Sequence, residues 1–306
     1  MNNLAPIALF VYARPDETSK TVEALSKNYL APESELYIFS DGPKGEKDFN
    51  KVAEVRKFIK SITTGFKKII IIEREKNLGL ANSIITGVSE VLRNNDKIIV
   101  MEEDLISSPN FLDFLNRSLQ KYENNKKVFS VTGYTYQLMI PNGYKFDNYF
   151  TTRCESLGWG TWKDRWIKAD WELKEFKNFI MNKNAVKNFN RVGSDLIGML
   201  IKQQLGKLDS WAVRWCFTHF NNNAVCSYPT SSKIIHIGEG GFATHVKRQN
   251  KLLDTELDFE NKQDFVLAEE VFFEKEIVNQ YKKFFKLNLI KKIKTKLLLL
   301  KFKISS

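Results

Sequence analysis

Ile98-Ile99-Val100-Met101-Glu102-Glu103-Asp104, residues 98–104, is the stretch of sequence that decides the fold. Its first four residues are apolar without interruption, which is typical of a strand buried on both faces of a parallel sheet. Three acids follow where that strand should end. Because ligands bind at the carboxyl ends of the strands in open α/β sheets, the stretch predicts a parallel sheet with an acidic ligand-binding edge.

Four further apolar runs, each bounded by turn residues, predict additional buried strands: Pro6–Tyr12, Glu35–Ser40, Lys68–Glu73 and Val128–Thr132. Helical patterns fill the gaps between them. The clearest covers Pro109–Tyr122, with Ser108 as the expected cap and Pro109 in the first turn. Alternating strands and helices predict an α/β fold with a doubly wound, mostly parallel sheet.

The regularity fails after about residue 145, where Trp159, Trp162, Trp166 and Trp171 lie close together. We therefore expect one half over residues 1–145 and a smaller half over 146–250, without a linker. Residues 251–306 are expected to form a helical, basic tail.

The charge is concentrated at the C-terminus. Nine Lys and no acid lie between Tyr281 and Ser306, so the rest of the chain carries only +2 of the net +11. The body is therefore not expected to bind nucleic acid. The first ten residues do not resemble a secretion signal, and the three cysteines suggest neither a zinc site nor a disulfide framework, so we expect a protein of the reducing cytoplasm.

Polar residues follow the first two predicted strands. Arg14 could face a diphosphate, and Asp41 could accept a hydrogen bond from a base or a ribose hydroxyl. The alternative makes Asp41 a turn former and Arg14 a surface cation. The sequence has no GxGxxG after the first strand and no GxxxxGK[ST], which disfavours dehydrogenases and kinases.

The acids Glu102, Glu103 and Asp104 repel one another unless a cation lies between them. Mg²⁺ or Mn²⁺ typically takes one or two carboxylates together with phosphate oxygens and water, and would neutralise a leaving diphosphate. The alternative is an acidic loop before the helix at Pro109, whose dipole favours negative charge.

Aromatic residues dominate the next candidates. Trp159 lies between two glycines and is expected to be an exposed platform for a sugar, whereas Trp166 and Trp171 are assigned to the core. Asp209, in Leu208-Asp209-Ser210-Trp211, could be a general base or could pair with Arg214. Its rivals as base are Glu155, Asp164 and Glu239.

The three histidines fall into two groups. The glycine-rich stretch from His236 to His245 is expected to be a mobile lid that includes Gly240 and Gly241. His219, between Phe217 and Phe220, is expected to be a packed histidine.

Taken in order, the segments YARP, FSDGPK, NLGLANS, IIVMEEDL, ESLGWGTW, LDSWAVRW and HIGEGGFATH resemble a glycosyltransferase of the GT-A (Rossmann-like) fold. The resemblance is to bacterial surface-polysaccharide (family 2-like) glycosyltransferases and, distantly, to the Golgi N-acetylglucosaminyltransferase I; it covers roughly residues 5 to 247. It implies that Arg14 and Asp41 contact the nucleotide, that Asp104 binds Mn²⁺ or Mg²⁺, and that Glu102 and Glu103 touch the donor sugar and ribose.

The resemblance also implies that Asp209 is the base, that Trp159 and Trp211 lie on the acceptor side, and that Gly240, Gly241 and His245 belong to the lid. It makes residues 1–145 the nucleotide-sugar-binding half and residues 146–250 the acceptor-binding and catalytic half. The chain departs from the family pattern in three places. Glu103 replaces the usual Asp, Ser210 replaces an acid next to the Trp, and the donor-site histidine of the Golgi enzyme has no counterpart in the helix expected over Leu80–Arg93.

The expected function is an inverting transfer of a sugar from a nucleotide donor, expected to be a UDP-sugar, to an acceptor hydroxyl in surface polysaccharide or lipopolysaccharide assembly. The alternatives are a non-catalytic sugar- or partner-binding module on the same fold, or a nucleotidyltransferase.

The tail carries its own pattern. Leu289, Ile293, Leu297, Leu300 and Ile304 recur at spacings of four and three among many lysines. This pattern predicts a helix that lies on an anionic membrane surface, peripheral on the inner face of the cytoplasmic membrane, where a lipid- or glycan-linked acceptor would be found. The alternative is a solvated or disordered basic tail.

Overall fold

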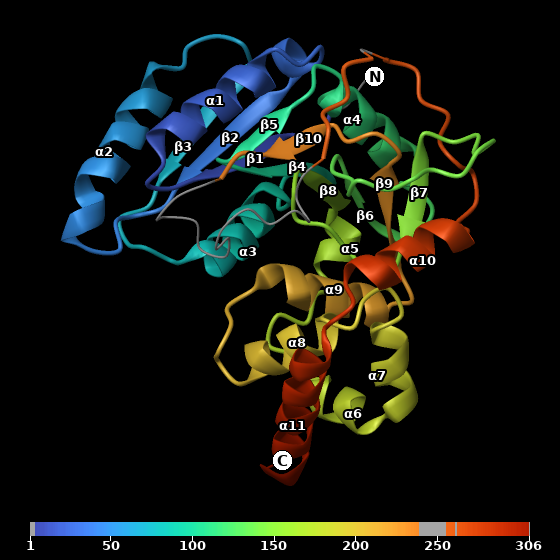
Figure 1. Ribbon diagram of the computed structural model, residues 1–306. Helices are drawn as coiled ribbons and strands as arrows, with labels where there is room; N and C mark the ends of the chain where they lie inside the picture. Colours follow the sequence, from blue (N-terminus) through green and yellow to red (C-terminus); the bar gives the residue numbers. More distant parts are fainter. Residues whose placement is uncertain (1–3, 239–254, 261, 306) are drawn as a thin grey trace.

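The computed structural model describes residues 4–238, 255–260 and 262–305 (Figure 1). The elements of the N-terminal part are β1 (Ile7–Val11), α1 (Pro15–Ser26), the 3-10 helix η1 (Ala31–Glu33), β2 (Glu35–Ser40), α2 (Glu46–Ser61), β3 (Lys68–Glu73), α3 (Leu80–Val91), β4 (Lys97–Glu102), β5 (Leu105–Ser107), α4 (Phe111–Lys121) and β6 (Val128–Thr132). The later elements are β7 (Asn148–Thr151), β8 (Trp159–Trp162), α5 (Lys163–Trp166), α6 (Phe176–Met181), α7 (Lys183–Phe189), α8 (Leu196–Gln204), α9 (Trp211–Asn221), β9 (Val225–Pro229), β10 (Ile234–His236), α10 (Lys275–Phe284) and α11 (Leu289–Ser305).

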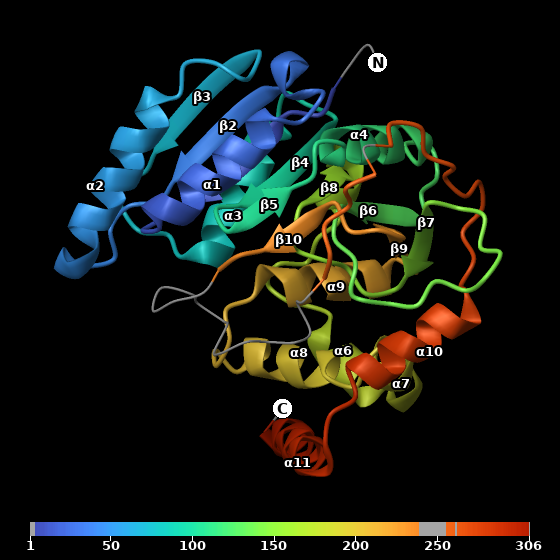
Figure 2. The ribbon, with the colours of Figure 1, turned by 45° about the horizontal axis from the view of Figure 1, so that its top comes forward.

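Eight strands form one sheet in the order β3-β2-β1-β4-β8-β6-β9-β7 (Figure 2). The pairs β1–β2, β1–β4, β2–β3 and β6–β9 are parallel, and β8 and β7 run antiparallel to their neighbours. The expected fold class, an α/β fold built on a mostly parallel sheet, is confirmed. All five predicted strands are present; three have the predicted bounds and β1 and β4 differ slightly.

Helices cover both faces of the sheet. On one face, α4 lies against β8, because the carbonyl of Leu119 accepts from the indole N–H of Trp162 and Leu119 also packs on Gly160. On the other face, α9 packs on Trp159 of β8, which is next to Gly160 in the strand and therefore faces the opposite side of the sheet. Trp211 of α9 stacks on Trp159 with ring centroids 5.0 Å apart. The sheet is therefore doubly wound, as expected.

The start of α4 differs from the expectation. The helix begins at Phe111 with Asn110 at its N-cap, and no side chain caps it. The hydroxyl of Ser108 instead donates to Oδ1 of Asn110, at 2.7 Å. Ser108 is therefore engaged with the cap residue and is not itself the cap.

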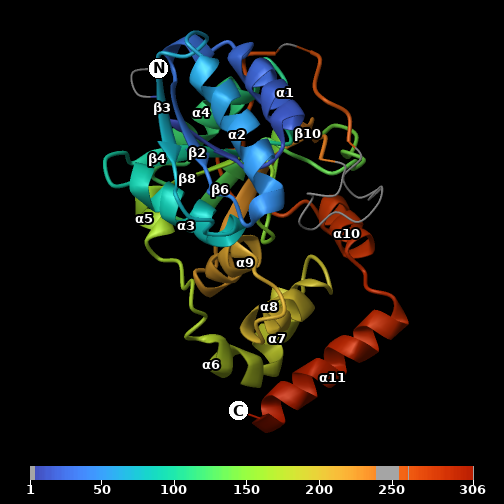
Figure 3. The ribbon, with the colours of Figure 1, turned by 90° about the vertical axis from the view of Figure 1, so that its left-hand side faces the viewer.

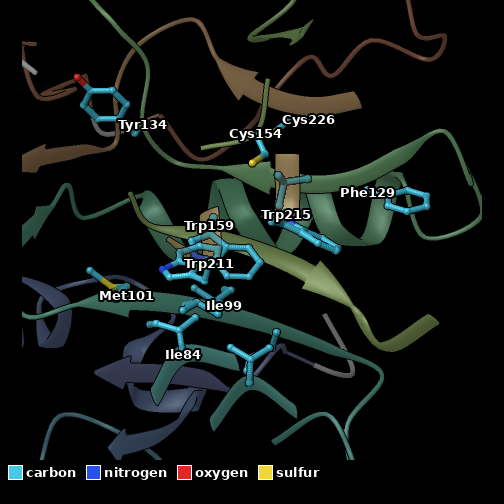
Figure 4. Close-up of a cluster of buried hydrophobic side chains, with 14 of the residues drawn as sticks. Ile84, Ile99, Met101, Phe129, Tyr134, Cys154, Trp159, Trp211, Trp215 and Cys226 are labelled. Atoms are coloured by element: carbon cyan, nitrogen blue, oxygen red, sulfur yellow. The ribbon is translucent and has the colours of Figure 1, made fainter. Parts of the chain in front are cut away.

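The sheet runs continuously from strands of the expected nucleotide half into strands of the expected acceptor half. Both expected halves share one hydrophobic core, in which Trp159, Trp211 and Trp215 pack beside Ile84 and Ile99 (Figure 4).

The expected tail divides into a part that packs on the core and a part that extends from it. Tyr281 of α10 is fully buried and its hydroxyl lies 3.0 Å from that of Tyr149 in β7. α11 extends away from the sheet along α8 and α6 (Figure 3). Within the described ranges, every helix is too short or too charged to span a bilayer.

Candidate functional site

The acidic triplet lies at the end of β4, in the middle of the sheet. Phe10 of β1 pairs with Glu102, so the loop after β1 and the loop after β4 leave the sheet side by side. Arg14, in the loop after β1, forms ion pairs with Asp104 and, at 3.8 Å from Nε to Oε1, with Glu103. The structure therefore brings together two loops that the sequence separates by about ninety residues.

Asp104 is the centre of this cluster. Its side chain also contacts Nε2 of His236, at 3.2 Å, and its carbonyl accepts from the N–H of Ile237, at 2.9 Å. The antiparallel pairing of β5 with β10 sets this contact, because it places His236 opposite Leu105. Arg14, Asp104 and His236 thus form one connected group at the carboxyl edge of the sheet.

Gly238 closes this group from one side. A Cβ built on Gly238 would lie 2.4 Å from Oδ2 of Asp104 and 2.9 Å from the ring of His236. A glycine is required here because the backbone packs directly on the carboxylate.

The pKa values of the three acids diverge. Burial, reinforced by the neighbouring carboxylates of Asp104 and Glu103, raises the pKa of Glu102 well above its ordinary value. Burial and the charge of Asp104 raise the pKa of Glu103 to about 7. Burial opposes ionisation of Asp104 as well, but His236 and Arg14 outweigh it and hold its pKa below the ordinary range. Asp104 is therefore the acid of the triplet that stays ionised near neutral pH.

Asp41 lies in the loop after β2, as expected, and its carboxylate already has partners. It accepts hydrogen bonds from the backbone N–H of Leu78 at 3.0 Å, Gly79 at 3.2 Å and Gly42 at 3.1 Å. Burial raises its pKa, and these backbone donors oppose the rise. Asp41 therefore joins the loop before α3 to the loop after β2. Its contact with a nucleotide stays a prediction.

The sequence had given the loop before α3 no role of its own. Asn77 donates from its amide to the carbonyl of Gly42, at 2.8 Å, and a Cβ on Gly42 would lie 2.6 Å from the backbone of Lys76. The close contact between the two loops is the reason for a glycine at position 42. His236 was also overlooked as a site residue, because the sequence placed it at the start of a lid.

Asp209 lies just before α9, where Ser210 caps the helix by accepting from the N–H of Val213 at 3.3 Å. Its side chain is 61% exposed and pairs with Arg214, with 3.0 Å from Oδ1 to Nη2. The Asp209 carboxylate therefore lies largely in solvent, and the alternative ion pair with Arg214 is present. The role of Asp209 as a base stays a prediction.

Trp159 and Trp211 were expected on the acceptor side, with Trp159 as an exposed platform. The structure corrects this expectation, because Trp159 is fully buried and Trp211 is 3% exposed. The glycines beside Trp159 have another cause: Gly160 allows close packing against Leu119, and Gly158 allows it against Ile234. Trp166 is in the core as expected, and Trp171 packs against it.

The rival bases differ in accessibility. Glu155 is buried and accepts from the hydroxyl of Tyr136 at 2.6 Å, and burial raises its pKa. Asp164 is half exposed and pairs with Lys126 and Arg165. Glu239, together with the lid residues Gly240, Gly241 and His245, lies outside the described residues.

His219 is packed, as expected. It is fully buried, and its ring nitrogens lie 2.9 Å from the carbonyl of Trp215 and 2.8 Å from the hydroxyl of Ser130. Burial lowers its pKa to about 4, so the ring is neutral in the folded protein at neutral pH.

The residues at the edge of the sheet fit a divalent cation in part. Across the residues that the structure describes, no three His, Cys, Asp or Glu side chains converge on a ready-made metal site. Asp104 and His236 do converge, and a carboxylate with an imidazole is a donor pair that Mn²⁺ accepts when phosphate oxygens and water complete its shell.

No protein-family model matches this chain, and no curated protein matches it. Among solved structures, S. aureus TarS 1–349 is 9% identical with a TM-score of 0.40, over 75% of this chain and 59% of that one. A structure entitled S. aureus TarS aligns with a TM-score of 0.42 and 9% identity, over 76% of this chain and 37% of that one. TarS 1–349 has also been solved in complex with UDP-GlcNAc, and this chain aligns with that structure with a TM-score of 0.38. The chain thus spans between 37% and 59% of the length of these structures.

Proposed function

We propose that this chain is a glycosyltransferase that moves a sugar from a UDP-sugar to an acceptor hydroxyl, with inversion at the anomeric carbon. The observation that carries the proposal is the joined group of Arg14, Asp104 and His236 at the carboxyl edge of a doubly wound sheet. Ligands of such sheets bind at this edge, and the group offers both a cation and metal-binding donors for a diphosphate.

Each residue has a part in the proposed reaction. Asp104 and His236 would hold Mn²⁺ or Mg²⁺, which supplies charge neutralisation for a departing diphosphate. Arg14 places a guanidinium beside the same carboxylate, where it can pair with phosphate oxygens. Asp209 would remove the proton of the acceptor hydroxyl. To do so it would first break its ion pair with Arg214, which its exposed carboxylate can exchange.

The acceptor in this proposal is a growing surface polysaccharide or lipopolysaccharide precursor carried on a lipid. The enzyme would therefore work peripherally at the inner face of the cytoplasmic membrane. The lysine-rich C-terminal segment supports this location, because positive charge attracts an anionic leaflet.

The test is an assay of UDP release from a panel of UDP-sugars with Mn²⁺, with and without EDTA. Slow UDP release that EDTA abolishes supports a metal-dependent transferase. Pyrophosphate-dependent exchange of nucleotide would identify a nucleotidyltransferase instead, and nucleotide-sugar binding without turnover in the presence of acceptor would identify a binding module. The anomeric configuration of the product, read by NMR, decides between inversion and retention.

A further inference from the structure

α11 carries apolar residues on two different faces, and one of these faces packs against the body. Leu298, Leu299 and Phe302 pack on the core, and the ring of Phe302 lies 5.0 Å from that of Phe176 in α6. A Cβ on Gly198 of α8 would lie 3.0 Å from Oγ1 of Thr295, so α8 and α11 approach closely. α11 is therefore held in a fixed position by this face (Figure 3).

The second apolar face is left in solvent. Its members are five residues with exposed fractions between 49% and 72%: Leu289, Ile290, Ile293, Leu297 and Leu300. At 3.6 residues per turn, these positions fall within about 100° of arc, roughly opposite the packed face. A soluble protein seldom leaves so continuous a row of large apolar side chains uncovered.

Lysines border this row on both sides. On the same helical projection, Lys294 lies at one edge of the row, and Lys292 and Lys296 lie at the other. Among the described residues, none of these three lysines forms an ion pair with an acid. The chain has no acid after Glu276, so the charge beside the row is uncompensated by sequence neighbours.

We propose that this free face, formed by Leu289, Ile290, Ile293, Leu297 and Leu300 with its bordering lysines, docks the protein on an anionic phospholipid bilayer. The apolar row enters the boundary between head groups and acyl chains, while the lysines reach lipid phosphates on either side. The opposite face stays on α8 and α6. The helix would then fix the orientation of the whole molecule on the membrane, because it is packed on the body and not merely tethered to it.

A second copy of this chain fits the same face less well. Pairing two such rows would bring their bordering lysines together with no acid between them, and like charges across an interface cost free energy. An anionic bilayer satisfies both the apolar row and the positive charge. The inference is independent of the chemistry at Asp104 and concerns where the protein works.

The structure also dictates how to test the idea. Removing everything after Gln280 would delete Tyr281, which is fully buried and bonded to Tyr149. Such a truncation would damage the core. Substitutions on the free face of α11 in the full chain avoid this problem.

The experiment is flotation of the full chain with vesicles of phosphatidylglycerol and phosphatidylcholine in equal parts, and with vesicles of phosphatidylcholine alone. We expect the wild type to float with the anionic vesicles, and the double variant Ile293→Ser with Leu297→Ser to lose roughly tenfold or more in partition coefficient. The matched control is Phe49→Ser with Ile167→Ser, two residues 56% and 74% exposed outside α11, and it should float like the wild type.

A triple variant with Lys292, Lys294 and Lys296 each changed to Gln tests the charge. Its partition coefficient on the anionic vesicles should fall by roughly tenfold or more. Added salt should likewise weaken the binding of the wild type to these vesicles. Equal flotation of the wild type and the Ile293/Leu297 variant would overturn the proposal. The proposal would also be overturned if the wild type failed to float and instead formed a dimer in light scattering, and if the Ile293/Leu297 variant no longer formed that dimer.

Release of UDP in vesicle-free solution separates this inference from the proposed function. The free-face variants should turn over donor like the wild type, because α11 lies outside the site. If the wild type releases no UDP, the transferase proposal fails while the flotation result still decides the docking face.

Discussion

Asp104 and Asp209 each pair with an arginine, and the two pairs differ in almost every physical respect. Asp104 is 9% exposed and is bound by Arg14 and His236 at once. Asp209 has a side chain that is 61% exposed and has Arg214 as its partner. A buried carboxylate must be paired to stay charged, whereas an exposed one can exchange its partner for water or substrate at little cost. The Asp104 carboxylate is therefore held in place by its partners, whereas the Asp209 carboxylate is free to exchange its partner, and these properties suit the different roles proposed for the two acids.

The largest effect should follow from Asp104→Asn. The change removes the charge that Arg14 and His236 share, and with it the proposed anchor for the cation, so turnover should fall by about 1000-fold. UDP affinity measured by calorimetry should fall as well and should no longer respond to EDTA. The matched control is Asp264→Asn, because the side chain of Asp264 is 96% exposed. Equal affinity of the wild type for UDP with and without EDTA would contradict the metal site.

The second prediction concerns His219, a buried histidine on α9, the helix that follows Asp209. Because this ring is buried in its neutral form, the free energy of unfolding should depend on pH. The pKa of His219 is about 4 in the folded protein, against an ordinary value of 6.5. Between these values the unfolded chain binds a proton that the folded protein does not, so this contribution to stability is complete above pH 6.5 and is lost as the pH falls towards 4.

The His219 contribution should amount to about 3 kcal/mol of unfolding free energy across that window. Urea unfolding at pH 7.5 and at pH 4.5 gives the change in unfolding free energy with pH for the wild type and for His219→Gln. Because glutamine cannot titrate, the difference between these two changes is the contribution of His219. The variant should have the shallower pH dependence. Identical pH dependence in the two proteins would show that His219 is not buried in its neutral form.

Asp209→Asn addresses the exposed side of the comparison. If Asp209 is the base, turnover should fall by about 100-fold, while UDP-sugar affinity and melting temperature barely change because the side chain is largely exposed. Asp164→Asn is tested beside it, since Asp164 is a rival base, half exposed and paired with arginine and lysine. Near-normal turnover in Asp209→Asn would show that Asp209 is only the ion-pair partner of Arg214. Loss of turnover in Asp164→Asn would instead identify Asp164 as the base.

The sequence predicted five of the eight strands of the sheet, because apolar runs bounded by turn residues are typical of parallel strands, but it did not predict β7, β8 and β9. It also predicted β3 as a buried strand, whereas β3 lies at the edge of the sheet and is only partly buried. β2, β3 and β6 have the predicted bounds, and the acids after β4 lie at the predicted edge. Burial of aromatic residues was harder to predict. Glycine beside Trp159 suggested an open platform, yet the same glycines serve close packing of helix and strand, and no local pattern distinguishes the two uses.

The sequence also did not predict the long-range pairing of β10 with β5. His236 reaches Asp104 because β10 pairs with β5, a strand of three residues that carries too little pattern to predict. In α11 four members of the predicted apolar row, Leu289, Ile293, Leu297 and Leu300, are exposed, and the side chain of the fifth, Ile304, lies outside the described residues. The sequence could not indicate that Leu298, Leu299 and Phe302, outside that row, would be the residues that pack on the body.

The smallest effect, and the finest test of the buried site, is expected from Gly238→Ala. The added methyl group would lie 2.4 Å from Oδ2 of Asp104, so the carboxylate or the strand end must move by several tenths of an ångström. Because Arg14 and His236 both bind that carboxylate, a small displacement weakens two contacts together, and UDP affinity in Mn²⁺ should fall by about tenfold. Gly45→Ala is the control, since a Cβ there meets nothing within 4 Å. If the Gly238 variant binds UDP as the wild type does, the Asp104 carboxylate tolerates displacement, and the contrast between a fixed buried acid and a free exposed one loses its basis.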